Sequence, residues 1–235
     1  MARRKKKKPA PTPPAAGTRR RNVVIGGIVV SVLAVIAILV ALALGSRESQ
    51  RDVVTVYHGI QGGFTEEGFP YLGSLEAPVV LVEFTDFNCS HCQAYNLQSE
   101  DGILADYVAT GQVRYVLHFY SSTNPRSWQA AEAAMCAADQ GLYFQFQRAL
   151  FESPTALRED FIARARDVGL DVGEFTACWD AGRHHNALMG HIRAAGEMGI
   201  SVTPSFRVND QLVVGNRPDM IRQAIDDELV LVGQQ

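Results

Sequence analysis

The longest apolar run of the chain lies between residues 23 and 44, where 22 consecutive positions carry no charged side chain. At a rise of about 1.5 Å per helical residue, a run of this length crosses the hydrocarbon core of a bilayer. The pattern therefore predicts a transmembrane anchor over residues 22–45. The alternative is a cleaved signal peptide, because small residues end the run where a signal peptidase could cut.

After the anchor the pattern changes twice. Residues 46–72 contain glycines but no strong hydrophobic period, which indicates a linker and an irregular lead-in. Val79 to Thr85 is almost continuously apolar and β-branched, as is typical of a strand that is covered on both faces. Residues 90–110 have helical spacing, and residues 113–120 form a second apolar run. This strand, helix, strand order predicts a parallel pair with a right-handed crossover.

Helical spacing continues over residues 124–198, in a segment rich in Ala, Glu, Gln and Arg. Two short apolar runs follow at 205–209 and 211–215, joined at Asn209-Asp210, which suits a hairpin turn. A last helix is expected from Pro218. We therefore predict one α/β domain over residues 73–235, with a helical insertion at about 124–198.

Charge is strongly segregated along the chain. Residues 1–21 hold nine basic side chains and no acidic one, which leaves 13 arginines and no lysine against all 25 acidic residues. The basic, proline-rich tail is expected to be disordered and cytoplasmic, because the positive-inside rule places it there and the later residues outside. We therefore expect a single-pass protein of the cell membrane with an extracytoplasmic domain. The acidic domain suits neither nucleic acid nor anionic lipid, so contact with the membrane is expected through the anchor alone.

Two of the four cysteines stand three positions apart in "DFNCSHC", directly after the first strand. A C-x-x-C pair by itself suits a redox centre, a structural disulfide or a metal clamp. At the start of a helix, unpaired N–H groups favour a thiolate at Cys89, while Cys92 lies one turn inside and resolves the mixed disulfide. His91, if protonated or donating a hydrogen bond, lowers the pKa of Cys89 further. Glu83 is expected to be buried and to carry the proton of Cys92, the alternative being a strand residue that faces water.

The segment "VLVEFTDFNCSHC" resembles the active-site segment of the DsbA-like thioredoxin-fold oxidoreductases, and the similarity extends over about residues 73–232. The resemblance implies a thioredoxin-like fold with a helical insertion. The segment "GISVTPSFRVN" is similar to the thioredoxin-fold loop in which a threonine precedes a cis-proline. Pro204 is thereby expected to be cis, and Thr203 to offer backbone groups to a substrate strand. Ser90 and Val202 depart from the family's frequent proline and glycine, which leaves the direction of electron flow open.

The remaining cysteines, Cys136 and Cys178, both lie in the helical insertion. In an exported protein two such cysteines more often pair than stay free, and similar family members can carry a second disulfide there. The alternative is two buried free thiols. The histidines of the insertion, His184, His185 and His191, are expected on a solvated helix face rather than in a metal site. His118 is expected at a strand end or in the core.

These features lead to the hypothesis of a thiol-disulfide oxidase that acts on exported proteins with free thiols. The resemblance further implies a membrane redox partner that reoxidises the pair, and no cofactor or metal is expected. A reductase or isomerase would use the same residues at a lower potential. From another class, a copper-binding metal-delivery module could use Cys89, Cys92 and a histidine. A redox-inert, peptide-binding scaffold would leave the cysteine pair unexplained.

Overall fold

The computed structural model describes residues 32–40, 53–121, 124–155 and 157–234. The chain divides into two compact units, residues 1–48 and 49–235. In the first unit, the described residues 32–40 are helical. The predicted tail (1–21) and most of the predicted anchor (22–45) lie outside the described residues. Within the described part, no helix is both long and apolar enough to span a membrane.

The second unit is built on a seven-stranded sheet with the order β1-β2-β3-β5-β4-β6-β7. The two central strands, β4 (Val79–Thr85) and β5 (Val113–Phe119), are parallel, and all other neighbours are antiparallel. The hairpin of β6 (Ser205–Val208) and β7 (Gln211–Val214) completes the edge beyond β4, with Asn209 at a positive φ in its turn. These four strands lie where the hydrophobic pattern predicts them.

The crossover from β4 to β5 is one continuous helical segment with two turns of π-helix. It consists of α2 (Ser90–Tyr95), η1 (Asn96–Glu100), α3 (Asp101–Ile103) and η2 (Leu104–Val108). Its buried positions recur at intervals of three or four from Cys92 to Val108. The segment thereby packs one face against the sheet, as the predicted helix at 90–110 requires.

The expectation of an irregular lead-in over residues 46–72 is wrong for its described part. This part contains β1 (Thr55–Tyr57), β2 (Ile60–Phe64) and β3 (Pro70–Leu72), and β3 pairs with β5. The strands are short, and a Cβ at Gly62 would lie 1.9 Å from the carbonyl oxygen of Tyr71. The glycine that weakens the sequence pattern is therefore required for close strand pairing. The domain begins by residue 55 rather than at 73.

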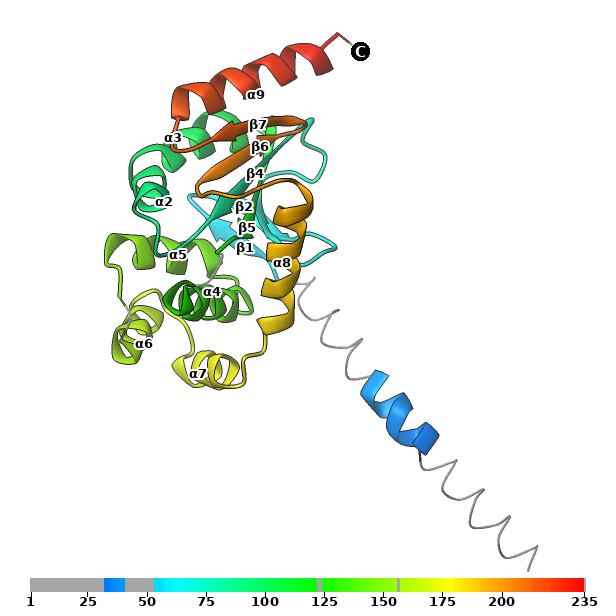
Figure 1. The fold of residues 1–235 in the computed structure, drawn as a ribbon, viewed down its shortest axis with the longest axis vertical. Coiled ribbons are helices and arrows are strands. Elements are labelled where there is room, and N and C mark those ends of the chain that lie inside the picture. The colour runs from blue at the N-terminus through cyan, green and yellow to red at the C-terminus, as the bar shows by residue number, and fades with distance from the viewer. Residues whose placement is uncertain (1–31, 41–52, 122–123, 156, 235) are drawn as a thin grey trace, which may run out of the picture. The chain divides into compact units, whose positions relative to one another are not determined.

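Five helices form the predicted insertion: α4 (Pro125–Ala138), α5 (Tyr143–Glu152), α6 (Arg158–Asp167), α7 (Val172–Asp180) and α8 (His185–Glu197). Figure 1 shows α4 to α7 gathered together, while α8 runs back toward the sheet. The last helix, α9 (Pro218–Val232), packs against β4, β6 and β7. The thioredoxin-like α/β fold with a helical insertion is thus present.

Candidate redox site

The cysteine pair lies at the carboxyl end of β4, where the chain turns into α2. Asp86 shapes this turn, because its side chain accepts a hydrogen bond from the Asn88 N–H (2.8 Å) and its carbonyl accepts one from the Cys89 N–H (3.1 Å). Cys89 is the N-cap of α2, and its sulfur accepts a hydrogen bond from the Cys92 N–H at 3.4 Å. Cys89 is half-buried, whereas Cys92 is fully buried. Only the first sulfur is therefore open to an attacking substrate.

The loop before β6 brings Thr203 and Pro204 to the pair. β6 is antiparallel to β4, with Ser205 opposite Phe84, so the preceding loop lies beside the turn that follows β4. The Thr203-Pro204 bond is cis. The Cys89 sulfur lies 3.4 Å from the Thr203 carbonyl oxygen, across 114 residues of sequence. The four residues predicted as the redox pair and its substrate loop therefore meet in one place.

The two thiols have opposite acid strengths. Hydrogen bonding from the Cys92 thiol, with smaller contributions from the Thr203 side chain and the backbone N–H groups of Cys92 and His91, lowers the pKa of Cys89 to about 5 against the effect of partial burial. Desolvation and the neighbouring Cys89 raise the pKa of Cys92 far above its usual value. His91 contributes through its backbone N–H, while its side chain is exposed. This arrangement suits nucleophilic exchange at Cys89 with Cys92 held as a thiol.

Glu83 is fully buried on β4, so the alternative of a water-facing residue is wrong. Desolvation raises its pKa to about 7, even though the Tyr115 hydroxyl donates a hydrogen bond to its carboxyl group. The charge of Glu83 in turn raises the pKa of Cys92. The carboxyl group therefore titrates near neutral pH beside the buried sulfur.

Three residues of this environment, Tyr115, Glu100 and Asn96, are absent from the site predicted from the sequence. Tyr115 of β5 also contacts a second buried carboxyl, Glu100, at 3.0 Å, and Asn96 donates to the same carboxyl at 2.6 Å. A signal for two of them exists, because Asn96 and Glu100 occupy polar positions on the otherwise apolar stripe of the crossover helix. A polar side chain at a buried position usually has a hydrogen-bond partner, so these two positions indicate a polar contact in the core.

Cys136 of α4 and Cys178 of α7 form a disulfide with a Cα–Cα distance of 5.8 Å. A ring nitrogen of His184 lies within 4.8 Å of both sulfurs, and His184 Nε2 lies 3.0 Å from Asp139 Oδ2. Because the thiolate is the form that ligates metals, the bonded sulfurs are not suited to hold an ion with this histidine.

The expectation of a solvated histidine face is wrong for two of the three histidines in the insertion. His184 and His191 are buried, and only His185 is exposed. His191 accepts a hydrogen bond from the Phe119 N–H at 3.1 Å, and Phe69 stacks on His118 with ring centroids 3.6 Å apart. Helix α8 packs against β5, so these imidazoles belong to the core.

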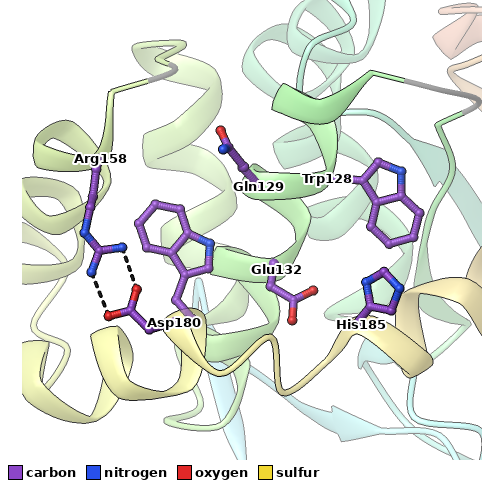
Figure 2. A pocket seen from close by; sticks show the side chains of 7 residues that line it. Trp128, Gln129, Glu132, Arg158, Asp180 and His185 are labelled. Carbon is purple, nitrogen blue, oxygen red and sulfur yellow. Dashed lines mark hydrogen bonds and ion pairs between the residues drawn. The ribbon is translucent and has the colours of Figure 1, made fainter.

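A cavity of about 440 Å³ lies in the helical insertion, as Figure 2 shows. Trp128, Trp179 and Glu132 line it, and the Arg158–Asp180 ion pair lies at one side. None of its lining residues belongs to the cysteine pair or to the cis-proline loop. The cavity is therefore separate from the redox site.

The strand order, the C-x-x-C pair at a helix start and the cis-proline opposite it define a protein of the thioredoxin class. A family model described as thioredoxin matches residues 65–227. The chain belongs to this family.

Individual proteins are similar to the chain over part or most of their own length. The chain is 35% identical over 141 residues to the Na(+)/H(+) antiporter NhaA 3 of Salinispora tropica, which covers 58% of the chain but only 21% of the antiporter. It is 23% identical over 189 residues to the disulfide bond formation protein D of Bacillus subtilis, covering 72% of the chain and 81% of that protein. A thioredoxin-like oxidoreductase from Silicibacter pomeroyi DSS-3 superposes with a TM-score of 0.60 at 31% identity, covering 68% and 91% of the two chains.

Proposed function

We propose that the protein is an extracytoplasmic thiol-disulfide oxidoreductase, anchored in the cell membrane by residues 22–45, which forms disulfides in exported proteins. The observation that carries the proposal is the asymmetry of the two sulfurs. Cys89 is accessible and has a pKa of about 5, whereas Cys92 is buried with a raised pKa. A stabilised thiolate favours the reduced pair, and the corresponding disulfide is therefore a strong oxidant.

The exchange begins at the oxidised pair. A substrate thiolate attacks the Cys89 sulfur, a bond forms between the two, and the Cys89–Cys92 bond breaks with its electron pair going to Cys92. Glu83 supplies the proton that converts Cys92 to a thiol, because its buried carboxyl titrates beside that sulfur. A second substrate thiolate then attacks the substrate sulfur of the mixed disulfide, and Cys89 leaves as a thiolate.

Each cycle transfers two electrons. The substrate loses two electrons and gains one disulfide, and the protein takes up both electrons in its reduced pair. A membrane redox partner accepts them and restores the disulfide. The backbone around Thr203 lies at the Cys89 sulfur, so an extended substrate segment can pair there as an added strand.

Three observations support direction and location. A low pKa at the accessible sulfur favours oxidation of substrates. A relative over most of both chains carries the name disulfide bond formation protein. The uncharged run of 22 residues behind a basic tail is the pattern of a membrane anchor with the later residues outside.

The test is the reduction potential of the Cys89–Cys92 pair in the full-length protein, equilibrated in glutathione buffers, with all four cysteines mapped by alkylation. We expect a potential more oxidising than about −200 mV, and transfer of the disulfide to reduced, unfolded ribonuclease. A value near that of thioredoxin, about −270 mV, would make the protein a reductase or isomerase. Stoichiometric copper in the purified protein would favour the metal-delivery alternative.

Two variants and a topology measurement complete the test. Cys92→Ser should accumulate mixed disulfides with substrate through Cys89, and Cys89→Ser should form none. Protease treatment of intact cells should degrade the domain while leaving the amino terminus protected. Protection of the whole chain in intact cells would contradict the assigned location.

A further inference from the structure

A chain of three buried side chains connects the redox site to the crossover helix. Tyr115 of β5 donates its hydroxyl to a carboxyl oxygen of Glu83 on β4, and the same hydroxyl oxygen lies 3.0 Å from Glu100 Oε1 at the end of η1. All three side chains have at most 1% of their surface exposed. Tyr115 is paired with Leu81, two positions before Glu83 in β4, so both side chains lie on one face of the sheet.

The number of protons available to Glu83, Tyr115 and Glu100 restricts their protonation states. A tyrosine hydroxyl has one proton and can donate it to one carboxyl at a time. Among the described residues, neither Glu83 nor Glu100 forms an ion pair with a basic side chain. Two carboxylates around one hydroxyl in a dry core would repel each other without compensation. One of the two carboxyls must therefore carry its own proton and donate it to the tyrosine oxygen.

The contacts assign that proton to Glu100. Its Oε2 accepts a hydrogen bond from Asn96 Nδ2 at 2.6 Å, which leaves Oε1, the atom beside Tyr115, to carry the proton. Desolvation raises the pKa of Glu83 to about 7, and the charge of Cys89 adds to this, so Glu83 is the carboxyl that interacts with the redox pair. Burial and the neighbouring Glu83 hold the pKa of Glu100 well above its usual range.

We propose that Glu100 is a positioning residue that stays a neutral acid and donates its O–H to Tyr115, so that the Tyr115 O–H always points at Glu83. The proposal rests on the assignment of Glu83 as the proton carrier of Cys92. When Glu83 gives its proton to Cys92, the new carboxylate finds a donor already aimed at it. When Cys92 returns the proton, the same hydrogen bond weakens, and no proton leaves Glu100 in either direction.

Other groups around Glu100 do not replace this role. The titratable and charged groups that face it are Glu83 of β4, Tyr115 of β5, Tyr95 of α2, Tyr57 of β1, Tyr143 and Arg148 of α5, and the adjacent Asp101. Burial raises the pKa of each of these tyrosines, so they remain neutral near pH 7. Arg148 and Asp101 are paired with each other at 3.4 Å. Of this set, Glu83 is the group that titrates in the neutral range.

The experiment follows the carboxyl carbons of Glu83 and Glu100 by NMR during a pH titration of the reduced, full-length protein labelled with ¹³C-glutamate. In the unmodified protein, Glu100 should stay neutral throughout the pH range in which Glu83 ionises. Glu100→Gln keeps a neutral donor of the same shape and should move the Glu83 midpoint by at most a few tenths of a pH unit. Glu100→Met removes the donor and should raise the midpoint by about one pH unit, a tenfold loss of carboxylate. Tyr115→Phe should raise it at least as much.

Each outcome is decisive. A matched control is Glu132→Gln, which removes a buried carboxyl on α4 that bonds the His184 N–H, and it should leave the Glu83 midpoint unchanged. A Glu100 signal that ionises before Glu83, or a Glu100→Gln shift equal to that of Glu100→Met, would overturn the proposal. An unmoved midpoint in Glu100→Met would do the same. If that variant fails to fold, the order of ionisation in the unmodified protein still decides. The titration does not depend on substrate oxidation, so failure of the proposed oxidase activity would be recognised separately.

Discussion

Stabilisation of the Cys89 thiolate should make the reduced protein lose stability on acidification in a way that the oxidised protein does not. The pKa of this thiol falls from an ordinary value of 9.0 to about 5 in the folded protein. The pKa of Cys89 is lower in the folded than in the unfolded protein. Its ionisation therefore contributes fully to the stability of the reduced protein above pH 9, and this contribution is lost as the pH falls through 5. The oxidised protein has no Cys89 thiol and therefore lacks this contribution.

The magnitude follows from the two pKa values. At about pH 7, the difference gives an upper bound of about 3 kcal/mol of extra stability in the reduced form. Cys89 is half-exposed, and solvent screens its interactions, so we reduce this to about 1.5 kcal/mol. For a two-electron couple, this corresponds to a rise of about 30 mV in the reduction potential.

The assay is urea unfolding of the reduced and oxidised proteins at about pH 7 and about pH 4. The difference in unfolding free energy between the two forms should shift by about 1.5 kcal/mol in favour of the oxidised form at the lower pH. Reduced Cys89→Ser should show no such shift. Glu83→Gln, measured in both redox forms, removes the coupled titration of that carboxyl. An equal difference at both pH values would refute the stabilised thiolate and with it the oxidant strength assigned to the pair.

Further predictions concern the supporting structure. Replacing Cys136 and Cys178 together by alanine opens a loop of 42 residues and should lower the unfolding free energy by about 4 kcal/mol in denaturant titrations, whereas a loss below about 1 kcal/mol would contradict the entropic estimate. Phe206→Ala empties a fully buried site against Tyr95 and should cost about 3–5 kcal/mol, against less than about 0.5 kcal/mol for the exposed Leu212→Ala. Burial lowers the pKa of His118 to about 4, below its unfolded value, so its contribution to stability is present above pH 6.5 and is lost toward pH 4. His118→Leu should therefore flatten the stability profile between these values, and an unchanged profile would assign the acid loss elsewhere.

The hydrophobic pattern predicts the strands whose neighbours cover them on both faces. β4 and β5 have continuous apolar runs because they lie at the centre of the sheet, and their positions follow from the sequence within a residue. The hydrophobic pattern does not predict β1 to β3, because each has only three to five residues and Gly62 interrupts the alternation. β1, β2 and β3 pair with one another, and their connection to the rest of the sheet is through the pairing of β3 with the distant strand β5, which local sequence does not reveal.

The residues of the redox site likewise divide into those that the sequence predicts and those that it does not. Cys89 and Cys92 lie three positions apart in the sequence, and the loop around Pro204 has a recognisable pattern, so these residues could be predicted before their contact was known. Glu100 is visible in the sequence only as a polar position on an apolar helix face, because its role arises from a tyrosine on another strand and from a π-helical turn that alters the spacing of the crossover helix. The burial of His184 and His191 likewise depends on how α8 packs against β5.

The short strand β1 fastens the sheet to the helical insertion. The Thr55 hydroxyl donates to the Gly141 carbonyl at 2.7 Å, Gln145 donates to the Val56 carbonyl at 2.7 Å, and the Tyr57 ring stacks on Phe144. A hinge motion that opened the insertion away from the sheet would have to break these contacts together. These contacts hold the insertion against the sheet, so under the proposed function we expect the change of shape on binding to occur in the substrate. An unfolded polypeptide can change its conformation in this way, whereas a folded protein cannot.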